Sequence, residues 1–387
     1  MSKNFKTYFI IIFLSTISAL YLFESYLLIK EKNIILKKAE IYKKKTGKSY
    51  DLRSKFEVYN DLKNDKEKVT LSMTAWSKIF LDKNDLLPLS GLSNIKSILC
   101  NENGYYSSYL SDRYGFNNPD KEWDKKSIDY LVLGDSFAHG ACVNRPNDIS
   151  SVLRSLSKKN VLNLGISGNG PLTEYATLRE YKHTNVKNII WIYFEGYDLA
   201  DLINEKKNFI LMNYIKDENF SQNLRNRNDA KDQVVKKITK KEYNRIVEKY
   251  SDDNKLKYKI LKFIRLDKTK KVIFVNQVIS EEINERVFKD FRNIMALTKI
   301  EADKMKSKLY FVYLPEFLRL SENYSNKNYY KVLKIVSDLD IPIIDLKKNL
   351  LDKEKNPFDL YPFGMNAHFN VKGYRKSSQI ILENIKN

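Results

Sequence analysis

Residues 129–137 read DYLVLGDSF, an apolar run that ends in Gly-Asp-Ser. Runs of Val, Leu, Ile and Tyr without polar alternation are typical of strands that are buried on both faces. In an open parallel sheet, ligands bind at the carboxyl ends of the strands. Ser136, which follows such a strand and opens a helix, would present its hydroxyl and its backbone N–H at that edge. The Asp-Ser pair is also compatible with an ordinary helix N-cap.

Four more apolar runs of strand length follow, and helical stretches separate them. They read NVLNLG (160–165), KNIIWIYF (187–194), KLYFVYLP (308–315) and IPIIDL (341–346). Strands that alternate with helices predict a central parallel sheet with helices on both faces, a three-layer α/β/α sandwich of the flavodoxin-like kind. About a hundred residues before the fourth run exceed the needs of one crossover, so we expect a mostly helical insertion at about 200–306.

An N-terminal segment, residues 8–29, reads YFIIIFLSTISALYLFESYLLI and is long enough to cross a bilayer as one helix. A cleaved signal peptide would have a shorter apolar region and a small-residue cleavage site, whereas LLIKEKN follows here. We therefore expect a retained transmembrane anchor over residues 1–30. The lysines on its carboxyl side outnumber those at the amino terminus, which favours a cytoplasmic domain. A single short anchor is nevertheless a common tether for enzymes outside the membrane, and we expect that orientation.

Beyond the anchor, residues 31–86 are rich in Lys and nearly free of Gly and Pro, which predicts a basic helical stalk. Residues 87–128 are rich in turn-forming residues and form a lead-in to the main domain, which we expect to cover residues 87–387. The net charge of +20 suits an anionic partner such as lipid, polysaccharide or nucleic acid. Because no nucleic-acid reading motif accompanies the charge, we expect no nucleic-acid partner.

The chain has two cysteines, Cys100 and Cys142, which are too few for a disulfide framework and lack the CxxC spacing of metal sites. Two buried free thiols are the simple interpretation. Outside the cytoplasm the two could pair, but the sequence gives no distance between them. We expect no metal site and no cofactor.

Polar and Gly-rich motifs follow the next strands. The second predicted strand runs into NLGISGNGP (163–171), whose glycines would let the backbone approach a ligand closely. The third ends in EGYDL (195–199), and the C-terminal region holds NAHFN (366–370) followed by Gly373-Tyr374.

These blocks, in this order, resemble the SGNH/GDSL hydrolases over roughly residue 129 to the C-terminus. The resemblance implies that Ser136 is the nucleophile and that the N–H groups of Ser136 and Gly168 form an oxyanion hole. It also implies that His368 is the catalytic base. Asp135, Asp198 and Asn366 are supporting residues on the same motifs. The count of histidines points the same way, because only His139 and His183 compete for the role and both have a structural interpretation.

Two positions depart from the family pattern. Tyr197 stands where the third block usually has an oxyanion-donating Asn. Met365 stands where an Asp usually precedes the catalytic His by three residues. The acid partner therefore comes from elsewhere, with Asp359 as a weak candidate, or a Ser-His dyad operates with the His oriented by a backbone carbonyl.

From these observations we expect an ester hydrolase or acyl transferase that needs no cofactor. An O-acyl group on a cell-envelope polysaccharide is the favoured substrate, and lipid esters are the second choice. The alternative from another class is a degenerate SGNH module that binds glycan or scaffolds an envelope complex without turnover.

Overall fold

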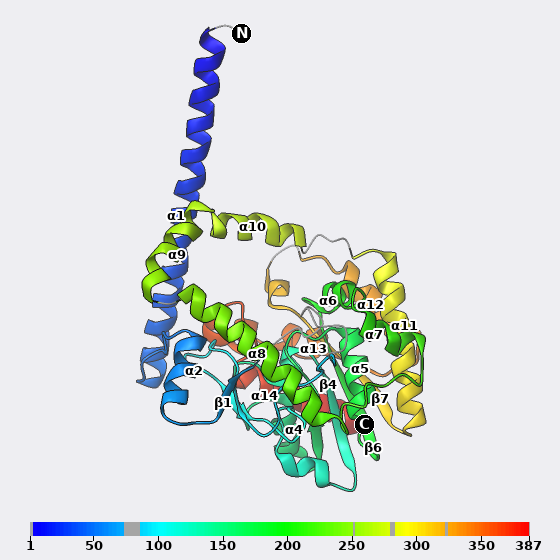
Figure 1. Cartoon of the computed structure of the whole chain (residues 1–387). Helices are drawn as coiled ribbons and strands as arrows, with labels where there is room; N and C mark the ends of the chain where they lie inside the picture. The colour runs from blue at the N-terminus through cyan, green and yellow to red at the C-terminus, as the bar shows by residue number, and fades with distance from the viewer. Residues whose placement is uncertain (1–2, 73–85, 251, 279–282, 322–323, 387) are drawn as a thin grey trace. The chain divides into compact units, whose positions relative to one another are not determined.

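The computed structural model describes residues 3–72, 86–250, 252–278, 283–321 and 324–386. By its internal contacts the chain divides into two compact units. The smaller comprises residues 1–50 and 240–282, and the larger comprises residues 51–239 and 283–387. The larger unit holds the sheet that the sequence predicts, and the smaller holds the long N-terminal helix (Figure 1).

Five parallel strands form the central sheet of the larger unit, in the order β5-β4-β6-β7-β8. They are β4 (Ile128–Gly134), β5 (Val161–Asn163), β6 (Val186–Phe194), β7 (Lys308–Leu314) and β8 (Ile343–Asp345). Each overlaps one of the apolar runs from which strands were predicted, and β4 and β6 begin one residue before their runs. The chain leaves β4 for β5 on one side and then returns to β6 on the other. The carboxyl end of β4 is therefore the topological switch point, where such sheets bind their ligands.

Successive residues of β6 face opposite cores, which is why the run is apolar throughout. Trp191 packs in one core with residues of α5 and α11, and Ile192 packs in the other with residues of α4 and α14. The α/β/α sandwich is thus confirmed. Among the described residues, the α-helices that lie wholly within the larger unit are α2 (Lys55–Asn64), α3 (Ser136–His139), α4 (Ile149–Ser157), α5 (Pro171–Tyr181), α6 (Asp198–Glu205), α7 (Phe209–Lys216), α11 (Glu285–Lys304), α12 (Lys327–Ser337), α13 (Leu346–Asn349) and α14 (Val371–Lys386).

A second, three-stranded sheet precedes the central one. It consists of β1 (Val69–Leu71), β2 (Lys96–Ile98) and β3 (Ser108–Leu110), with β1 parallel and β3 antiparallel to β2. Neither this sheet nor its strands were predicted. Within the expected stalk, residues 31–86, the N-terminal helix continues to Thr46 and α2 and β1 follow, while residues 73–85 lie outside the described part of the chain.

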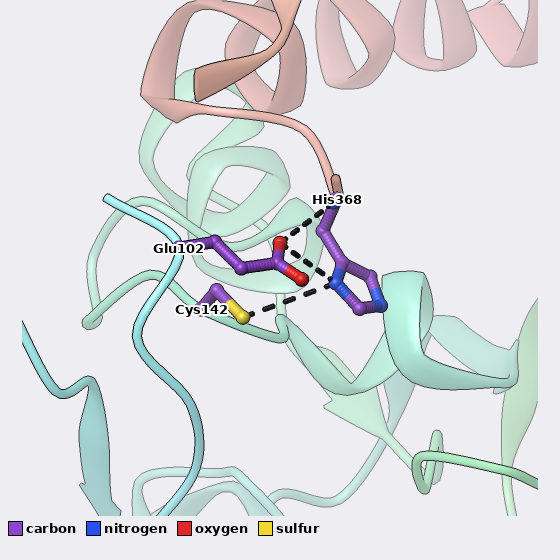
Figure 2. A group of neighbouring side chains, drawn as sticks. All are labelled: Glu102, Cys142 and His368. Atoms are coloured by element: carbon purple, nitrogen blue, oxygen red, sulfur yellow. Dashed lines mark hydrogen bonds and ion pairs between the residues drawn. The ribbon is translucent and has the colours of Figure 1, made fainter. Parts of the chain in front are cut away.

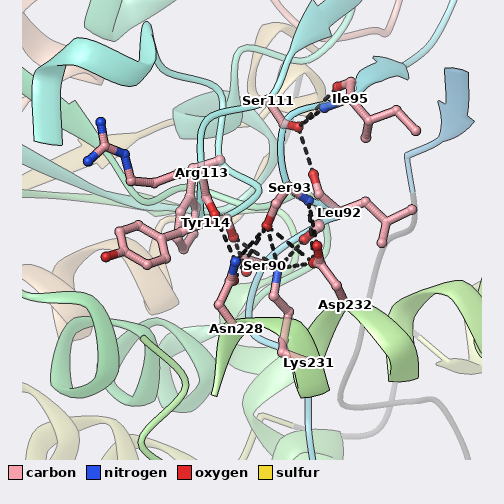
Figure 3. A network of polar contacts seen from close by, with 12 residues as sticks. Ser90, Leu92, Ser93, Ile95, Ser111, Arg113, Tyr114, Asn228, Lys231 and Asp232 are labelled. Carbon is pink, nitrogen blue, oxygen red and sulfur yellow. Dashed lines mark hydrogen bonds and ion pairs between the residues drawn. The ribbon is translucent and has the colours of Figure 1, made fainter. Parts of the chain in front are cut away.

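A buried lysine ties the lead-in to the start of α8 (Asn228–Tyr250) (Figure 3). The Lys231 ammonium donates to the carbonyl oxygens of Gly91 (2.6 Å) and Tyr114 (3.2 Å) and pairs with Asp232 at 2.7 Å. Because a buried charge is costly unless it is paired and hydrogen-bonded, these partners fix where the lead-in runs. Asn228 adds a hydrogen bond of 2.9 Å to the carbonyl of Arg113.

The smaller unit contains α1 (Lys3–Thr46), the end of α8, α9 (Asp252–Ile264) and α10 (Asp267–Val278). Its α1 is long and apolar enough to cross a membrane, and only 6% of its most apolar window is buried.

Candidate active site

The nucleophile candidate, Ser136, sits on a tight turn between β4 and α3. Gly134 ends the strand with φ of +146°, and a Cβ there would lie 2.8 Å from both the Ala138 Cβ and the Ile192 carbonyl oxygen. Only glycine fits this position without displacing the backbone. Asp135 then caps α3 by accepting from the Phe137 N–H at 2.9 Å. The N-cap role thus belongs to Asp135, and the role of the next residue, Ser136, as nucleophile stays a prediction.

His368 approaches Ser136 from the segment that precedes α14. Its Nε2 lies 2.8 Å from the Ser136 Oγ, although 232 residues separate the two in sequence. The imidazole packs against the Phe137 ring at 4.9 Å between centroids. This is the distance at which a general base takes the proton of a serine hydroxyl.

The carboxylate beside His368 belongs to Glu102, which the sequence analysis did not single out. One oxygen, Oε2, lies 3.0 Å from the His368 Nδ1 and accepts the His368 backbone N–H at 2.7 Å (Figure 2). Both ring nitrogens of His368 are thus engaged, one by an acid and one by a serine hydroxyl. The three residues stand in the order acid, base and nucleophile that a catalytic triad requires.

A disulfide holds Glu102 in place. Glu102 lies in the turn between β2 and β3, two residues after Cys100, and Cys100 is bonded to Cys142 in the loop after α3. Asn103 donates to the Cys142 carbonyl at 2.9 Å. Of the two alternatives that the sequence left open, free thiols and a disulfide, the structure has the disulfide. The bond joins the segment that carries the acid to the segment that carries the nucleophile.

The charges around His368 bias its protonation. Burial alone lowers the pKa of His368, but the hydrogen bond and charge of Glu102, together with the charge of Asp135, outweigh this effect and raise it. Burial raises the pKa of Asp135 to about 6, although the Phe137 N–H and His368 oppose the rise. The Ser136 hydroxyl also donates to Asp135 at 3.1 Å, so two acceptors compete for its single proton.

The second motif forms the loop between β5 and α5, and His139 holds this loop beside α3. Gly168 lies in it with φ of +82°. The neighbouring Ser167 donates its N–H to the His139 Nδ1 at 3.2 Å. Because a nitrogen that accepts a proton donor cannot itself carry a proton, His139 is neutral, and burial lowers its pKa to about 3. His139 has a structural role at this site.

The third motif is placed at the start of α6. Asp198 is buried and accepts the Phe194 N–H at 2.8 Å, so it closes the turn after β6. Tyr197 is 59% exposed, and its ring lies 5.8 Å from that of Phe194. Its role as an oxyanion donor stays a prediction.

Two further candidates, Asp359 and Asn366, lie on the surface. Asp359 accepts from Asn356 at 3.1 Å and lies 3.6 Å from the Lys372 ammonium, while Asn366 is exposed. His183, the third histidine, accepts the Asn185 N–H at 3.2 Å. The acid that contacts His368 is Glu102, and neither Asp359 nor Asn366 takes that place.

A metal-ligand pattern overlaps the site. Glu102, Cys142 and His368 bring ligand-type atoms within 4.8 Å of one another, and the Cys142 Sγ lies 3.8 Å from the His368 Nδ1 (Figure 2). Cys142 offers no thiolate because its sulfur is bonded to Cys100. The hydrogen bond between Glu102 and His368, and the position of the disulfide beside them, account for the short distances among the three residues.

The chain matches no protein-family model, and no curated protein matches it. Solved structures that it resembles include a member of the lipolytic protein G-D-S-L family from Veillonella parvula, at 11% identity and a TM-score of 0.35. That match covers 66% of this chain and 97% of the other. Another is an acetyl xylan esterase, at 12% identity and a TM-score of 0.37, with 67% and 100% covered.

Proposed function

We propose that this chain is a membrane-anchored serine ester hydrolase or acyl transferase of the SGNH type. One observation carries the proposal, namely the continuous relay from Glu102 through His368 to Ser136, with contacts of 3.0 and 2.8 Å. A helix N-cap would explain the Asp-Ser pair but would not require a histidine and a carboxylate to line up behind it. Nucleophile, base and orienting acid within hydrogen-bond reach are the marks of covalent acyl transfer.

In the proposed reaction, the His368 Nε2 takes the Ser136 proton while the Oγ forms a bond to the ester carbonyl carbon. The carbonyl π electrons move to the oxygen, which becomes the oxyanion. Glu102 accepts the Nδ1–H and stabilises the imidazolium that forms. When the intermediate collapses, the bond to the alcohol oxygen breaks and His368 returns its proton to that oxygen. Water or another hydroxyl then repeats the sequence on the acyl-enzyme and releases the acyl group.

The oxyanion would be stabilised by the backbone N–H groups of Ser136 and Gly168. Ser136 opens α3 and Gly168 lies in the loop that His139 holds, so the two amides belong to fixed segments. Such preorganised donors are worth about 3 to 4 kcal/mol each in other hydrolases. Tyr197 would supply a third donor through its hydroxyl.

The favoured substrate is an O-acyl group on an anionic cell-envelope polysaccharide. The net charge of +20 supports an anionic partner, and the apolar α1 supports attachment at the membrane. The disulfide between Cys100 and Cys142 supports an orientation with the larger unit outside the cytoplasm, because structural disulfides persist in oxidising compartments. This placement goes against the lysine count that flanks α1.

A second candidate is a glycan-binding module without turnover. The exposed Tyr197 ring favours it, because aromatic rings stack on sugar faces and the oxyanion Asn is missing here. This candidate and the hydrolase differ in whether Ser136 reacts.

The test is covalent labelling of the full chain in detergent with a fluorophosphonate probe, alongside hydrolysis of a short-chain nitrophenyl ester. Ser136→Ala should abolish both signals, and His368→Ala should lower turnover to a similar residual level, because triad members act as a unit. Ser155→Ala, on the exposed side of α4, is the matched control and should label as wild type does. Absence of labelling in the wild type would favour the glycan-binding module. Activity of His368→Ala within a few-fold of wild type would refute the base assignment.

A further inference from the structure

The smaller unit has a carboxylate inside its apolar helix. Glu24 lies within the apolar segment of α1 and is only 1% exposed. A carboxylate among apolar residues at membrane depth is costly unless it is paired or hydrogen-bonded. What satisfies Glu24 therefore indicates what lies against α1 at this level.

The first turn of α10 satisfies Glu24. Its carboxylate oxygens accept the backbone N–H groups of Lys268 at 3.0 Å and of Thr269 at 2.7 Å, and the Thr269 hydroxyl at 2.8 Å. The first N–H groups of a helix have no partner within it and need an external acceptor. Glu24 is thus an N-cap supplied by a different helix, and it fixes the start of α10 to α1.

The end of α9 is fixed to α1 at the same level. The Tyr21 hydroxyl donates to the Ile264 carbonyl at 3.0 Å, and the Tyr21 and Phe263 rings lie 5.4 Å apart. Two turns further along α1, Glu31 pairs with the Lys268 ammonium. Figure 1 shows α9 beside α1 and α10 leading away from it at this junction.

The height of the junction along α1 matches one face of a bilayer. Counted from Phe5, a hydrocarbon core of about 30 Å takes about 20 residues at 1.5 Å each and ends at Glu24, and the apolar run (residues 8–29) continues beyond it to residue 29. With Lys3 and Lys6 at the opposite face, Glu24 and the junction reach the headgroup boundary. Tyr26, two residues further along the helix and exposed, is the kind of residue that lies at such interfaces.

The surface of α9 is both apolar and basic. Leu256 is 70% exposed and Ile264 is 54% exposed, and with Ile260 they recur every four residues and so share one face. Lys255 and Lys262 lie away from that face. Exposed aliphatic residues continue on α10 at Val272 and Ile273. A helix with an aliphatic face and lysines elsewhere is typical of segments that lie in the interface of an anionic membrane.

We propose that α9 and α10 form a membrane-surface element that binds an anionic phospholipid bilayer, with Leu256, Ile260 and Ile264 in the acyl-headgroup boundary. The inference rests on the proposed anchoring of α1 and is independent of the ester chemistry. The element would hold the chain to the bilayer surface beside its anchor, in addition to the single span.

The experiment uses the full chain, with the native disulfide intact, reconstituted into vesicles of phosphatidylcholine and phosphatidylglycerol. An environment-sensitive fluorophore is attached at Ile264→Cys, at Lys255→Cys as the matched position away from the aliphatic face, and at Phe13→Cys as the reference within the span. Lipids with a spin label on the acyl chain should quench Phe13→Cys and Ile264→Cys strongly and Lys255→Cys weakly. Replacing phosphatidylglycerol by phosphatidylcholine should weaken the quenching at Ile264→Cys.

The outcomes separate the two proposals. Quenching at Phe13→Cys with none at Ile264→Cys would overturn the membrane-surface element and leave the anchor intact. Loss of quenching at Phe13→Cys would refute the anchor, and the element with it. Protection of Ile264→Cys from aqueous iodide without lipid quenching would mean that protein covers this face, which also overturns the proposal.

A second variant tests whether Glu24 holds the start of α10 against α1. Glu24→Ala removes the acceptor for the first turn of α10 and should reduce lipid quenching at a Val272→Cys label, while Glu31→Ala removes only an outer ion pair and should change it little. Unchanged quenching in Glu24→Ala would overturn the role of Glu24 in holding α10 at the surface.

Discussion

Replacing Glu102 tests the proposed relay most directly, because the two functions of its side chain can be separated. A single oxygen, Oε2, accepts both the Nδ1–H and the backbone N–H of His368. The amide oxygen of a glutamine can occupy the same position and accept both. Glu102→Gln therefore removes the charge and keeps the orientation, whereas Glu102→Ala removes both.

The expected loss of activity in Glu102→Gln follows from the solvent exposure of the His368 and Glu102 side chains. The side chains of His368 and Glu102 are 25% and 27% exposed, so the site is neither dry nor fully solvated. Opposite unit charges 4 Å apart interact by about 1 kcal/mol in water and about 4 kcal/mol near a protein surface. We take about 2 kcal/mol of imidazolium stabilisation, or about 30-fold in kcat, as the loss in Glu102→Gln. Glu102→Ala also frees the ring, and we expect a loss of about a thousandfold or more.

The pH profile supplies an independent readout. His368 acts as a base only when neutral, so activity rises with pH through its pKa, which Glu102 raises. Without the negative charge of Glu102 the pKa of His368 falls. In Glu102→Gln, the rise of activity with pH should therefore begin at a lower pH, and the maximal activity should be lower than in the wild type. A merely structural role of Glu102 would lower the maximal activity without changing the pH at which activity rises.

The assay is the pH dependence of nitrophenyl ester hydrolysis by the full chain, with fluorophosphonate labelling as a count of intact sites. Asp359→Asn is the matched control, because Asp359 is the acid that the sequence suggested and it lies at the surface. It should behave as wild type does. If Glu102→Ala retained activity within threefold of wild type, Glu102 would not be the acid member and the relay would reduce to a dyad.

Three further outcomes are expected. The double variant Cys100→Ser, Cys142→Ser should lower turnover toward the level of Glu102→Ala. It should also lower the melting temperature, since closing a loop of 42 residues stabilises a fold by about 4 kcal/mol in the chain-entropy model. Full activity in the double variant would show that the disulfide does not position Glu102. Tyr197→Asn should raise turnover about tenfold or more if a carboxamide donor is missing, since one such donor is worth a hundred- to a thousandfold. Tyr197→Phe should lower turnover if the hydroxyl donates, and no effect of either change would place Tyr197 outside the site. A phosphatase reporter fused after Lys48 should be active and a cytoplasmic reporter silent, and the reverse would place the larger unit in the cytoplasm.

The sheet could be predicted because its strands are buried on both faces. Trp191 and Ile192 pack into different cores, so the run that holds them has no polar position and stands out in the sequence. The strands of the three-stranded sheet, β1 to β3, show no such apolar run in the sequence. These strands have three residues each, and β2 includes Lys96 and Ser97, so no periodicity is long enough to recognise.

The site was predictable where the chemistry lies at the ends of strands or in a motif. Ser136 and His368 carry the resemblance, and the structure brings them within 2.8 Å. Glu102 was not predictable, because it comes from a turn of the lead-in that no motif marks, 266 residues before its partner. The one available signal was Cys100, two residues away. A predicted pairing with Cys142, in the loop after α3, would have placed that turn beside the nucleophile.

The order of the three residues along the chain bears on how the protein matures. Glu102 comes from a turn ahead of the central sheet, Ser136 from the helix after its first strand and His368 from the segment after its last strand. A disulfide, which forms under oxidising conditions, joins the segment of Glu102 to the segment of Ser136. A nascent chain that has reached α3 carries a serine without a base. A chain that is complete but still reduced lacks the tie that holds its acid. The proposed triad would therefore be complete only after the last segment of the chain has folded and the disulfide has formed.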